Sequence, residues 1–277
     1  MKIKFLGTGA SQGIPSPFCK CRICENARIL GNKEIRSRSG LMIDREIMID
    51  YSPDNFFRAA INSVDFTEIK YFLISHGHYD HFEVKDLVES RALEREWTGK
   101  PQSTYFIYGN KKVCSILETE IQRAGTEKIS IQTLIEKNKP IAIGKYSVVA
   151  LKTEHTIDED SYAYLIEKDG KSYFHCCDSG ELTEEIFDYL KSTSVKLNAV
   201  TFDATFGLRK EKFFGHMNLE QVVLTCDKLR NAGIIFEGTK IYLTHISHSG
   251  RCTHEELVQS ARKYGMEVAY DGLEFEI

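Results

Sequence analysis

The chain has 277 residues, enough to bury a large hydrophobic core, and its composition is ordinary for a soluble globular protein. Its formal net charge of −4 gives no support to a dedicated nucleic-acid binder, which usually carries a basic surplus. No segment approaches the roughly 20 apolar residues that span a bilayer, and the amino-terminal residues lack the apolar core of a secretion signal. We therefore expect neither a membrane nor nucleic acid as a partner.

Predicted strands and helices alternate along the chain, with antiparallel-looking strand pairs near both ends. Short apolar runs predict the strands, longer runs of helical composition predict the helices, and helix caps are expected at Asn218 and Thr253. In chain order, the predicted elements are strands Lys2–Leu6, Ser39–Ile43 and Glu46–Ile49, helix Phe56–Ile61, strand Tyr71–Ile74, helix Phe82–Arg95, strand Tyr105–Tyr108, helix Lys111–Arg123, strands Tyr146–Lys152, Tyr162–Glu167 and Ser172–Cys177, helix Leu182–Lys191, strand Val200–Phe202, helix Leu219–Arg230, strand Ile241–Leu243, a helix after Thr253, and strands Glu267–Ala269 and Leu273–Phe275.

This order predicts an α/β (α+β) fold in which two mixed sheets are sandwiched between helices, an αββα arrangement. The chain has no internal repeat, no low-complexity tract and no convincing linker. We therefore predict a single domain over residues 1–277, with a moderate insertion at about residues 82–145. The oligomeric state is left open by the sequence, and a homodimer is one of the alternatives.

Three cysteines stand close together near the amino terminus, at Cys19, Cys21 and Cys24, in a segment that also contains Pro15 and Pro17. The two prolines predict that this segment is a loop. Three thiols at C-x-C-x2-C spacing can wrap one tetrahedral zinc ion, but a closed structural site needs a fourth ligand. The alternative is three unrelated cysteines. The other five cysteines are scattered, which indicates reduced thiols and a cytoplasmic protein, because a secreted disulfide scaffold is smaller and denser in cysteine.

The hexapeptide His76–His81 has the sequence H-G-H-Y-D-H and directly follows a predicted buried strand. Imidazole and carboxylate ligands suit borderline or hard divalent ions. Because one ion cannot easily accept four groups from so short a turn, we predict two ions, with His76 and His78 on one and Asp80 and His81 on the other. The alternative is a histidine-rich surface loop, which this specific spacing disfavours.

Asp50 directly follows the predicted strand Glu46–Ile49. A carboxylate at that position is well placed to orient a ligand imidazole, and a role as a turn or helix-cap residue is the alternative. Further candidate ligands follow later strands in the same way. They are His155, Asp178, His245 and His248.

The motif and the order of these residues resemble the metallo-β-lactamase-fold hydrolases. The resemblance implies that His155 joins His76 and His78 on the first ion, and that His245 joins Asp80 and His81 on the second. Asp178 would bridge the two ions, where a cysteine would point toward some β-lactamases. A hydroxide held between two cations is a nucleophile at neutral pH, and a nitrogen and oxygen ligand set accepts zinc, manganese or iron.

Two segments, Thr201–Phe206 and Gly215–Asn218, are similar to those of phosphodiesterases and tRNA 3′-processing endonucleases of this superfamily. The similarity implies that Asp203 holds His216, and that His216 binds a phosphate oxygen or protonates the departing one. The alternative is that His216 is a loop residue before a capped helix. Together with Asp80, these two residues are the catalytic candidates.

The cysteine segment, read with G-T-G-A-S-Q-G-I-P before it and T-H-I-S-H near the end of the chain, resembles the phosphoribosyl 1,2-cyclic phosphate phosphodiesterases. In that family three cysteines and a histidine hold a structural zinc, which implies His248 as the fourth ligand. The expected function is a metal-dependent phosphodiesterase that acts on a small cyclic or linear phosphodiester. The alternatives are an RNA-processing nuclease and a metal-binding carrier like relatives in pyrroloquinoline quinone biosynthesis.

Overall fold

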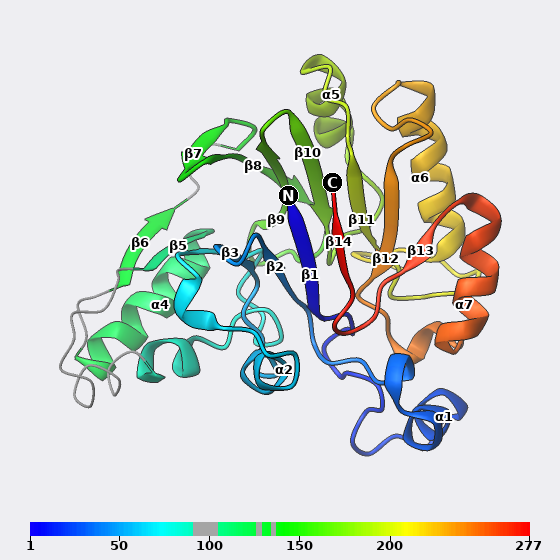
Figure 1. Cartoon of the computed structure of the whole chain (residues 1–277), viewed down its shortest axis with the longest axis horizontal. Helices are drawn as coiled ribbons and strands as arrows, with labels where there is room; N and C mark the ends of the chain where they lie inside the picture. Colours follow the sequence, from blue (N-terminus) through cyan, green and yellow to red (C-terminus); the bar gives the residue numbers. More distant parts are fainter. Residues whose placement is uncertain (91–104, 126–128, 134–136) are drawn as a thin grey trace.

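The computed structural model describes residues 1–90, 105–125, 129–133 and 137–277. Two sheets pack face to face, with helices on both outer sides (Figure 1). The strands of the first sheet are β1 (Lys2–Gly7), β2 (Gly40–Ile43), β3 (Ile47–Ile49), β4 (Tyr71–Leu73), β5 (Tyr105–Gly109), β6 (Ile129–Thr133) and β14 (Glu274–Glu276). Those of the second are β7 (Ile141–Ile143), β8 (Tyr146–Thr153), β9 (Ser161–Lys168), β10 (Lys171–Cys176), β11 (Ala199–Asp203), β12 (Lys240–Thr244) and β13 (Glu267–Val268).

Each sheet has an antiparallel part and a parallel part. The spatial orders are β14-β1-β2-β3-β4-β5-β6 and β13-β12-β11-β10-β9-β8-β7. Pairing is antiparallel from β14 to β3 and parallel from β3 to β6. In the second sheet it is antiparallel from β7 to β10 and parallel from β10 to β13. The expected class of two mixed sheets between helices is thus confirmed.

Helices cover the outer face of each sheet. In Figure 1, α2 and α4 lie beside the first sheet, and α5, α6 and α7 beside the second. Residues 84–90 are also helical. The bounds are α1 (Arg22–Leu30), α2 (Asn55–Ile61), α4 (Lys111–Ala124), α5 (Glu184–Ser192), α6 (Leu219–Asn231) and α7 (His254–Ala261), with short 3₁₀ turns η1 (Asn32–Glu34), η2 (Phe66–Glu68), η3 (His248–Gly250) and η4 (Arg262–Tyr264).

Strand β9 shows why these strands read as continuous apolar runs. Tyr162, Tyr164 and Ile166 belong to the core between the two sheets. Ala163 and Leu165 belong to the core between the second sheet and its helices. Successive side chains on a strand point to opposite faces, so a sheet that is covered on both faces buries every residue of its central strands.

Each predicted strand is present among the described residues, within about two residues at either end. The predicted helix Phe82–Arg95 is helical over residues 84–90. Residues 82 and 83 are not helical, so the predicted start was two residues early, and residues 91–95 lie outside the described residues. Residues 82–145 contribute the strands β5, β6 and β7 to the two sheets and also contain helix α4. The division into one domain with an insertion stays a prediction.

The sequence reading was wrong about the cysteine segment, which is only partly a loop. Helix α1 begins at Arg22, so Cys24 lies in its first turn and Cys21 is its N-cap residue. The helix is short and buries only Ile23, Cys24 and Ala27, of which Ile23 and Ala27 belong to the core that the helices share with the second sheet. The prolines and closely spaced cysteines of the preceding segment concealed this short amphipathic pattern.

Asp271 fastens the segment between β13 and β14 to the first sheet. Its buried carboxylate accepts hydrogen bonds from both the backbone N–H and the hydroxyl of Thr8, at 2.9 and 2.7 Å. It also accepts the backbone N–H and hydroxyl of Ser37 and lies 3.0 Å from the Arg58 guanidinium.

We expect Asp271→Ala to lower the free energy of unfolding by about 3–5 kcal/mol, because it leaves these donors without an acceptor and the Arg58 charge without its partner. Urea denaturation measures this loss. The matched control is Asp227→Ala, which breaks an exposed ion pair with Arg230 and should change stability by no more than about 0.5 kcal/mol. Equal effects of the two substitutions would contradict the role given to Asp271.

Candidate metal centre

The candidate site lies at one edge of the two sheets, where several strands end. β10, β11 and β12 run parallel in register, so the residues that follow them emerge side by side. Open sheets with parallel strands commonly bind ligands at the carboxyl ends of those strands. The side chains placed there are Asp50 after β3, His76 after β4, His155 after β8, Asp178 after β10, Asp203 at the end of β11 and His245 after β12.

Three of these residues leave their strands in a left-handed backbone conformation. The φ angles are +59° at Asp50, +51° at Asp178 and +58° at His245. Asp and His enter this region more readily than most residues, and such strained positions concentrate at functional sites.

The first donor set consists of His76, His78, His155 and Asp178, whose nearest ligand atoms all lie within 4.8 Å of one another. His76 Nε2 is 2.8 Å from His78 Nδ1, and His155 Nε2 is 3.4 Å from the same atom. Asp178 Oδ2 lies 3.3 Å from His76 Nε2 and 3.2 Å from His155 Nε2. The spacing suits three imidazoles and one carboxylate around one ion.

The second donor set consists of Asp80, His81, His245 and again Asp178. His81 Nε2 lies 2.9 Å from Asp178 Oδ2 and 3.5 Å from Asp80 Oδ2. The hexapeptide is therefore divided between two sets, His76 and His78 in one and Asp80 and His81 in the other. Asp178 is the only residue common to these two sets.

Three buried atoms of the site make no hydrogen bond: His81 Nε2, His245 Nε2 and Asp178 Oδ1. The three side chains are no more than 3% exposed. A buried polar atom without a partner costs about 1–3 kcal/mol, and a bound cation would satisfy all three atoms. Nitrogen and oxygen donors of this kind suit divalent ions such as zinc, manganese and iron. The donor sets therefore fit divalent metal.

Burial and neighbouring charges shift the pKa values of the site strongly. Burial would raise the pKa of Asp178, but His245, His81 and His155 hold it well below its usual value. Burial lowers the pKa of His76 well below its usual value. For His81, burial acts in the same direction, but the carboxylates of Asp50, Asp178 and Asp80 raise its pKa well above normal.

Asp50 contacts His81 on the side of the imidazole ring that faces away from the second donor set. Its Oδ2 lies 2.6 Å from His81 Nδ1, which leaves Nε2 as the nitrogen that faces the second donor set. Asp50 in turn accepts the backbone N–H of Ser75 at 2.7 Å and its hydroxyl at 3.0 Å. A carboxylate that fixes the orientation of a ligand histidine in this way is typical of metal sites. The sequence indicated Asp50 but not Ser75, which has no distinctive pattern.

The buried Asp203 and the partly exposed His216 form a pair beside the donor sets. Asp203 Oδ2 is 2.9 Å from His216 Nδ1, and its Oδ1 accepts the backbone N–H groups of Thr205 and Met217. Burial would lower the pKa of His216, but Asp203 and Asp178 raise it to about 9. Burial would raise the pKa of Asp203, but His216 and His245 lower it to about 2.

Thr205 was missed by the sequence analysis. Its hydroxyl oxygen is 2.8 Å from His245 Nδ1 and 3.2 Å from His216 Nδ1, so it links a candidate ligand to the candidate acid. A further donor set, Asp178, Asp203, His216 and His245, is also compact enough to hold an ion. The geometry alone therefore allows His216 either role, ligand or acid.

Glu159 was also missed, although it joins two ligand-bearing loops. Its side chain is 2% exposed, and its Oε2 accepts the backbone N–H of Gly77 at 2.8 Å and the side-chain amide of Asn110 at 2.6 Å. Glu159 follows His155 in the β8–β9 loop, so it ties that loop to the two histidines that flank Gly77. A Cβ at position 77 would lie 3.1 Å from Oε2, so glycine permits this close approach.

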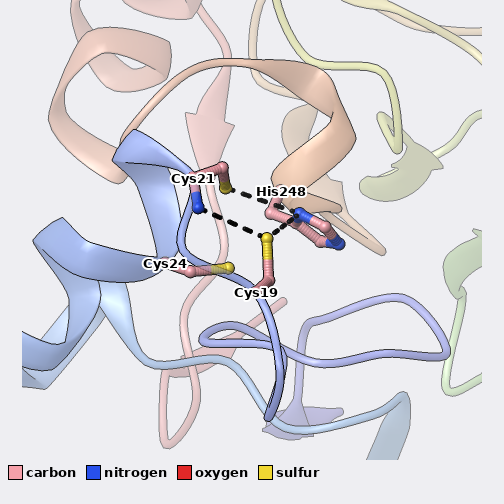
Figure 2. Close-up of side chains that lie close together, drawn as sticks. All are labelled: Cys19, Cys21, Cys24 and His248. Atoms are coloured by element: carbon pink, nitrogen blue, oxygen red, sulfur yellow. Dashed lines mark hydrogen bonds between the residues drawn. The ribbon is translucent and has the colours of Figure 1, made fainter.

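The cysteine segment forms a separate cluster with His248 (Figure 2). His248 Nδ1 faces the Sγ atoms of Cys19 and Cys21, at 3.5 and 3.6 Å, and Cys24 approaches from α1. Three thiols and one imidazole are a usual ligand set of structural zinc sites. Burial would raise the pKa of Cys21, but hydrogen bonds from Cys24, His248 and Cys19 lower it to about 6, which favours the metal-binding thiolate. None of the eight cysteines, all of which lie within the described residues, forms a disulfide.

We expect Cys21→Ser to lower the zinc content by about one ion per chain and to lower the melting temperature, while the ions of the strand-end site stay bound. A structural zinc contributes directly to folding energy. Elemental analysis and thermal melting test this, with Cys114→Ser, a cysteine outside the cluster, as the control. An unchanged melting curve and metal content would refute the cluster as a metal site.

A cavity of about 450 Å³ opens onto the strand-end site. Candidate ligands from both donor sets line it, and so does His216. The remaining predicted residues, His76, His81, Asp50 and Asp203, are fully buried behind this lining. A small substrate would thus meet both donor sets and the Asp203–His216 pair at once. The lining ligands are His78, Asp80, His155, Asp178 and His245.

The family model for the β-lactamase superfamily domain matches residues 45–246, most of the chain. The chain belongs to the β-lactamase superfamily. The match spans the strand-end residues from Asp50 to His245, whereas the three clustered cysteines and His248 lie outside it. The two sheets and the outer helices are those of the metallo-β-lactamase fold.

Solved structures of this superfamily share the fold over the whole chain. A diphosphatase of the PhnP family is 22% identical with a TM-score of 0.77, and the alignment covers 100% of this chain and 97% of that one. Zn²⁺-bound PqqB from Methylobacterium extorquens is 18% identical with a TM-score of 0.75 and full coverage of both chains. Human tRNase Z, short form, is 16% identical with a TM-score of 0.67, with coverage of 100% and 99%.

Among curated proteins, an octanoyltransferase of Porphyromonas gingivalis is 24% identical over 286 residues. The alignment covers 99% of this superfamily member but 51% of the relative, so the chain spans about half the length of the curated relative that it matches. Within the described residues, no helix combines the length and the apolar character needed to cross a membrane.

Proposed function

We propose that this chain is a metal-dependent phosphodiesterase that hydrolyses a small cyclic or linear phosphodiester. The observation that carries the proposal is the combination, around one cavity, of two donor sets sharing Asp178 with the Asp203–His216 pair. A pair of neighbouring cations is suited to reactions at phosphorus, where both the attacking and the departing oxygen carry charge. The diphosphatase of the PhnP family is consistent with a phosphoryl substrate.

In this proposal His76, His78 and His155 hold one ion, Asp80, His81 and His245 hold the other, and Asp178 contacts both. When bound, the two ions supply a hydroxide at neutral pH and neutralise negative charge on the phosphate. Zinc, manganese and iron all suit these donors. The cluster of Cys19, Cys21, Cys24 and His248 is proposed to hold a separate structural zinc.

The chain's own groups position and protonate the substrate. Asp203 accepts a hydrogen bond from His216 Nδ1–H, which leaves Nε2 as the nitrogen available to the cavity. From there His216 binds a phosphate oxygen or protonates the departing oxygen, a role in which a positioned histidine contributes about 10²–10⁴-fold. Asp80 stays a catalytic candidate because it lines the cavity as well as belonging to a donor set.

Phosphoribosyl 1,2-cyclic phosphate is an example of the proposed substrate class. A tRNA 3′-processing activity is the second candidate, and tRNase Z shares the fold, but the net charge of −4 disfavours a polyanionic RNA. A carrier with little turnover, as among pyrroloquinoline quinone biosynthesis proteins, is the third, and the Asp203–His216 pair argues against it. Because none of the eight described cysteines forms a disulfide, we place the protein in the cytoplasm; a homodimer is compatible with the proposal.

The test is to load the protein with zinc, manganese or iron, measure the metal content by elemental analysis, and assay a panel of cyclic and linear phosphodiesters. We expect turnover of at least one small diester, with about two ions bound at the strand-end site. Cleavage of precursor tRNA in preference to every small diester would favour the nuclease. Full metal occupancy without turnover of any diester would favour the carrier.

A further inference from the structure

The cysteine cluster and the reaction cavity share a wall. Ser247 and Ser249, the residues on either side of His248, both line the cavity. Ser11 and Gln12, from the segment after β1, line it as well. Backbone hydrogen bonds from Ala10 N to Ile246 O and from Ile246 N to Thr8 O join the two segments, at 3.1 and 2.9 Å. A histidine of the cluster thus stands between two residues that a substrate would touch.

His248 also reaches Gln12 directly. Its Nδ1 faces the thiols, so the ring proton must lie on Nε2 when Nδ1 binds metal or accepts a thiol proton. Nε2 lies 2.5 Å from Gln12 Oε1, so the imidazole donates to the amide oxygen. The oxygen of Gln12 is thereby engaged, and its NH₂ group is left as a hydrogen-bond donor.

The described lining of the cavity contains no lysine and no arginine. Its side chains other than the candidate ligands and His216 include three serines, one threonine and Gln12. Proteins usually bind a second phosphate group with arginine or lysine, whereas neutral donors suit hydroxyl, ether and carbonyl oxygens. This wall therefore suits a substrate whose non-reacting part is neutral and rich in hydroxyl groups. Within the proposed class it disfavours phosphoribosyl 1,2-cyclic phosphate, whose ribose carries a second phosphate.

We infer that Gln12, oriented by His248 of the cysteine cluster, is a specificity-determining residue that donates a hydrogen bond to a neutral, hydroxyl-bearing group of the substrate. The inference rests on the proposed function, since it assumes a phosphate ester in the cavity. The inference also gives the cysteine cluster an effect besides stability. His248, which belongs to the cluster, engages the Gln12 amide oxygen and leaves the NH₂ group of Gln12 available to the substrate.

Two phosphate monoesters test this by isothermal titration calorimetry on the metal-loaded, full chain. Glycerol 2-phosphate carries hydroxyl groups and methyl phosphate carries none. We expect Gln12→Leu to weaken the binding of glycerol 2-phosphate by about 3–10-fold, the usual worth of one neutral hydrogen bond, and to leave methyl phosphate binding unchanged. Metal content and melting temperature should stay unchanged. Gln259→Leu, the same substitution on the exposed face of α7, is the matched control.

A variant of the cluster tests the link to His248. Cys19→Ser should produce the same selective loss of glycerol 2-phosphate binding, and Gln12→Leu should add nothing on that background. Equal weakening of both esters by Gln12→Leu, or weakening of neither, would overturn the inference while the proposed function stands. So would additive effects of the two substitutions. If the unsubstituted protein bound neither ester and hydrolysed no diester, both the proposed function and this inference would fall.

Discussion

Asp178→Ala is expected to remove metal from both strand-end donor sets and to lower turnover by more than about 10⁴-fold. Asp178 lies 2.9 Å from His81 Nε2 in one set and 3.2 Å from His155 Nε2 in the other. Loss of a group that only supports a ligand costs about 10–100-fold in metal affinity, so loss of a shared ligand should cost more at both sites. Without the ions the reaction loses both its nucleophile and its main charge stabilisation.

The measurement is metal content after dialysis against a weak chelator, followed by phosphodiester turnover. Asp188→Ala, the same substitution at an exposed position of α5, is the control and should leave both unchanged. Retention of one ion at full affinity in Asp178→Ala would show that the carboxylate serves a single site. Retention of both ions at full affinity would contradict the assignment of Asp178 as a ligand shared by the two donor sets.

His216→Ala is expected to cut turnover by about 10²–10⁴-fold while the metal content stays the same. The residue is 22% exposed, lines the cavity, and is held at Nδ1 by Asp203. Since another compact donor set includes His216, elemental analysis decides between its two roles. Loss of an ion in this variant would make His216 a ligand and would remove it as the proposed acid.

Asp203→Asn provides the companion measurement. Because Asp203 acts through His216, its substitution should lower turnover by a comparable factor, and the double variant should lose little more than either single one. Fully additive losses would mean that the two residues act separately.

Much of the fold follows from local patterns. The hydrophobic runs predict the central strands because these strands are buried on both faces, as in β9, and the capping pairs mark the starts of α6 and α7. Helix α1 was not predicted, because nine residues with three buried positions make a weak pattern beside a cysteine motif. Tertiary packing, more than propensity, stabilises so short a helix.

The candidate ligands could be found in the sequence because their chemistry is unusual and most follow a predicted strand. Four of them stand within the six residues His76–His81, and Asp178 and His245 follow strands in a recognisable order. The residues that orient these ligands, in contrast, carry no such signal in the sequence. Ser75, Thr205 and Glu159 are common residue types at unremarkable positions, and each acts through a hydrogen bond to a neighbouring loop or ligand.

The sequence by itself determined the class of the fold, the residues able to bind metal and their expected division into two groups. These depend on side-chain chemistry and on alternation along a strand, which are local properties. Only the tertiary structure decided that Glu159 joins two ligand loops and that His248 reaches Gln12. Such contacts join residues up to 236 positions apart, and the packing of two sheets, which no local pattern encodes, brings them within hydrogen-bond distance.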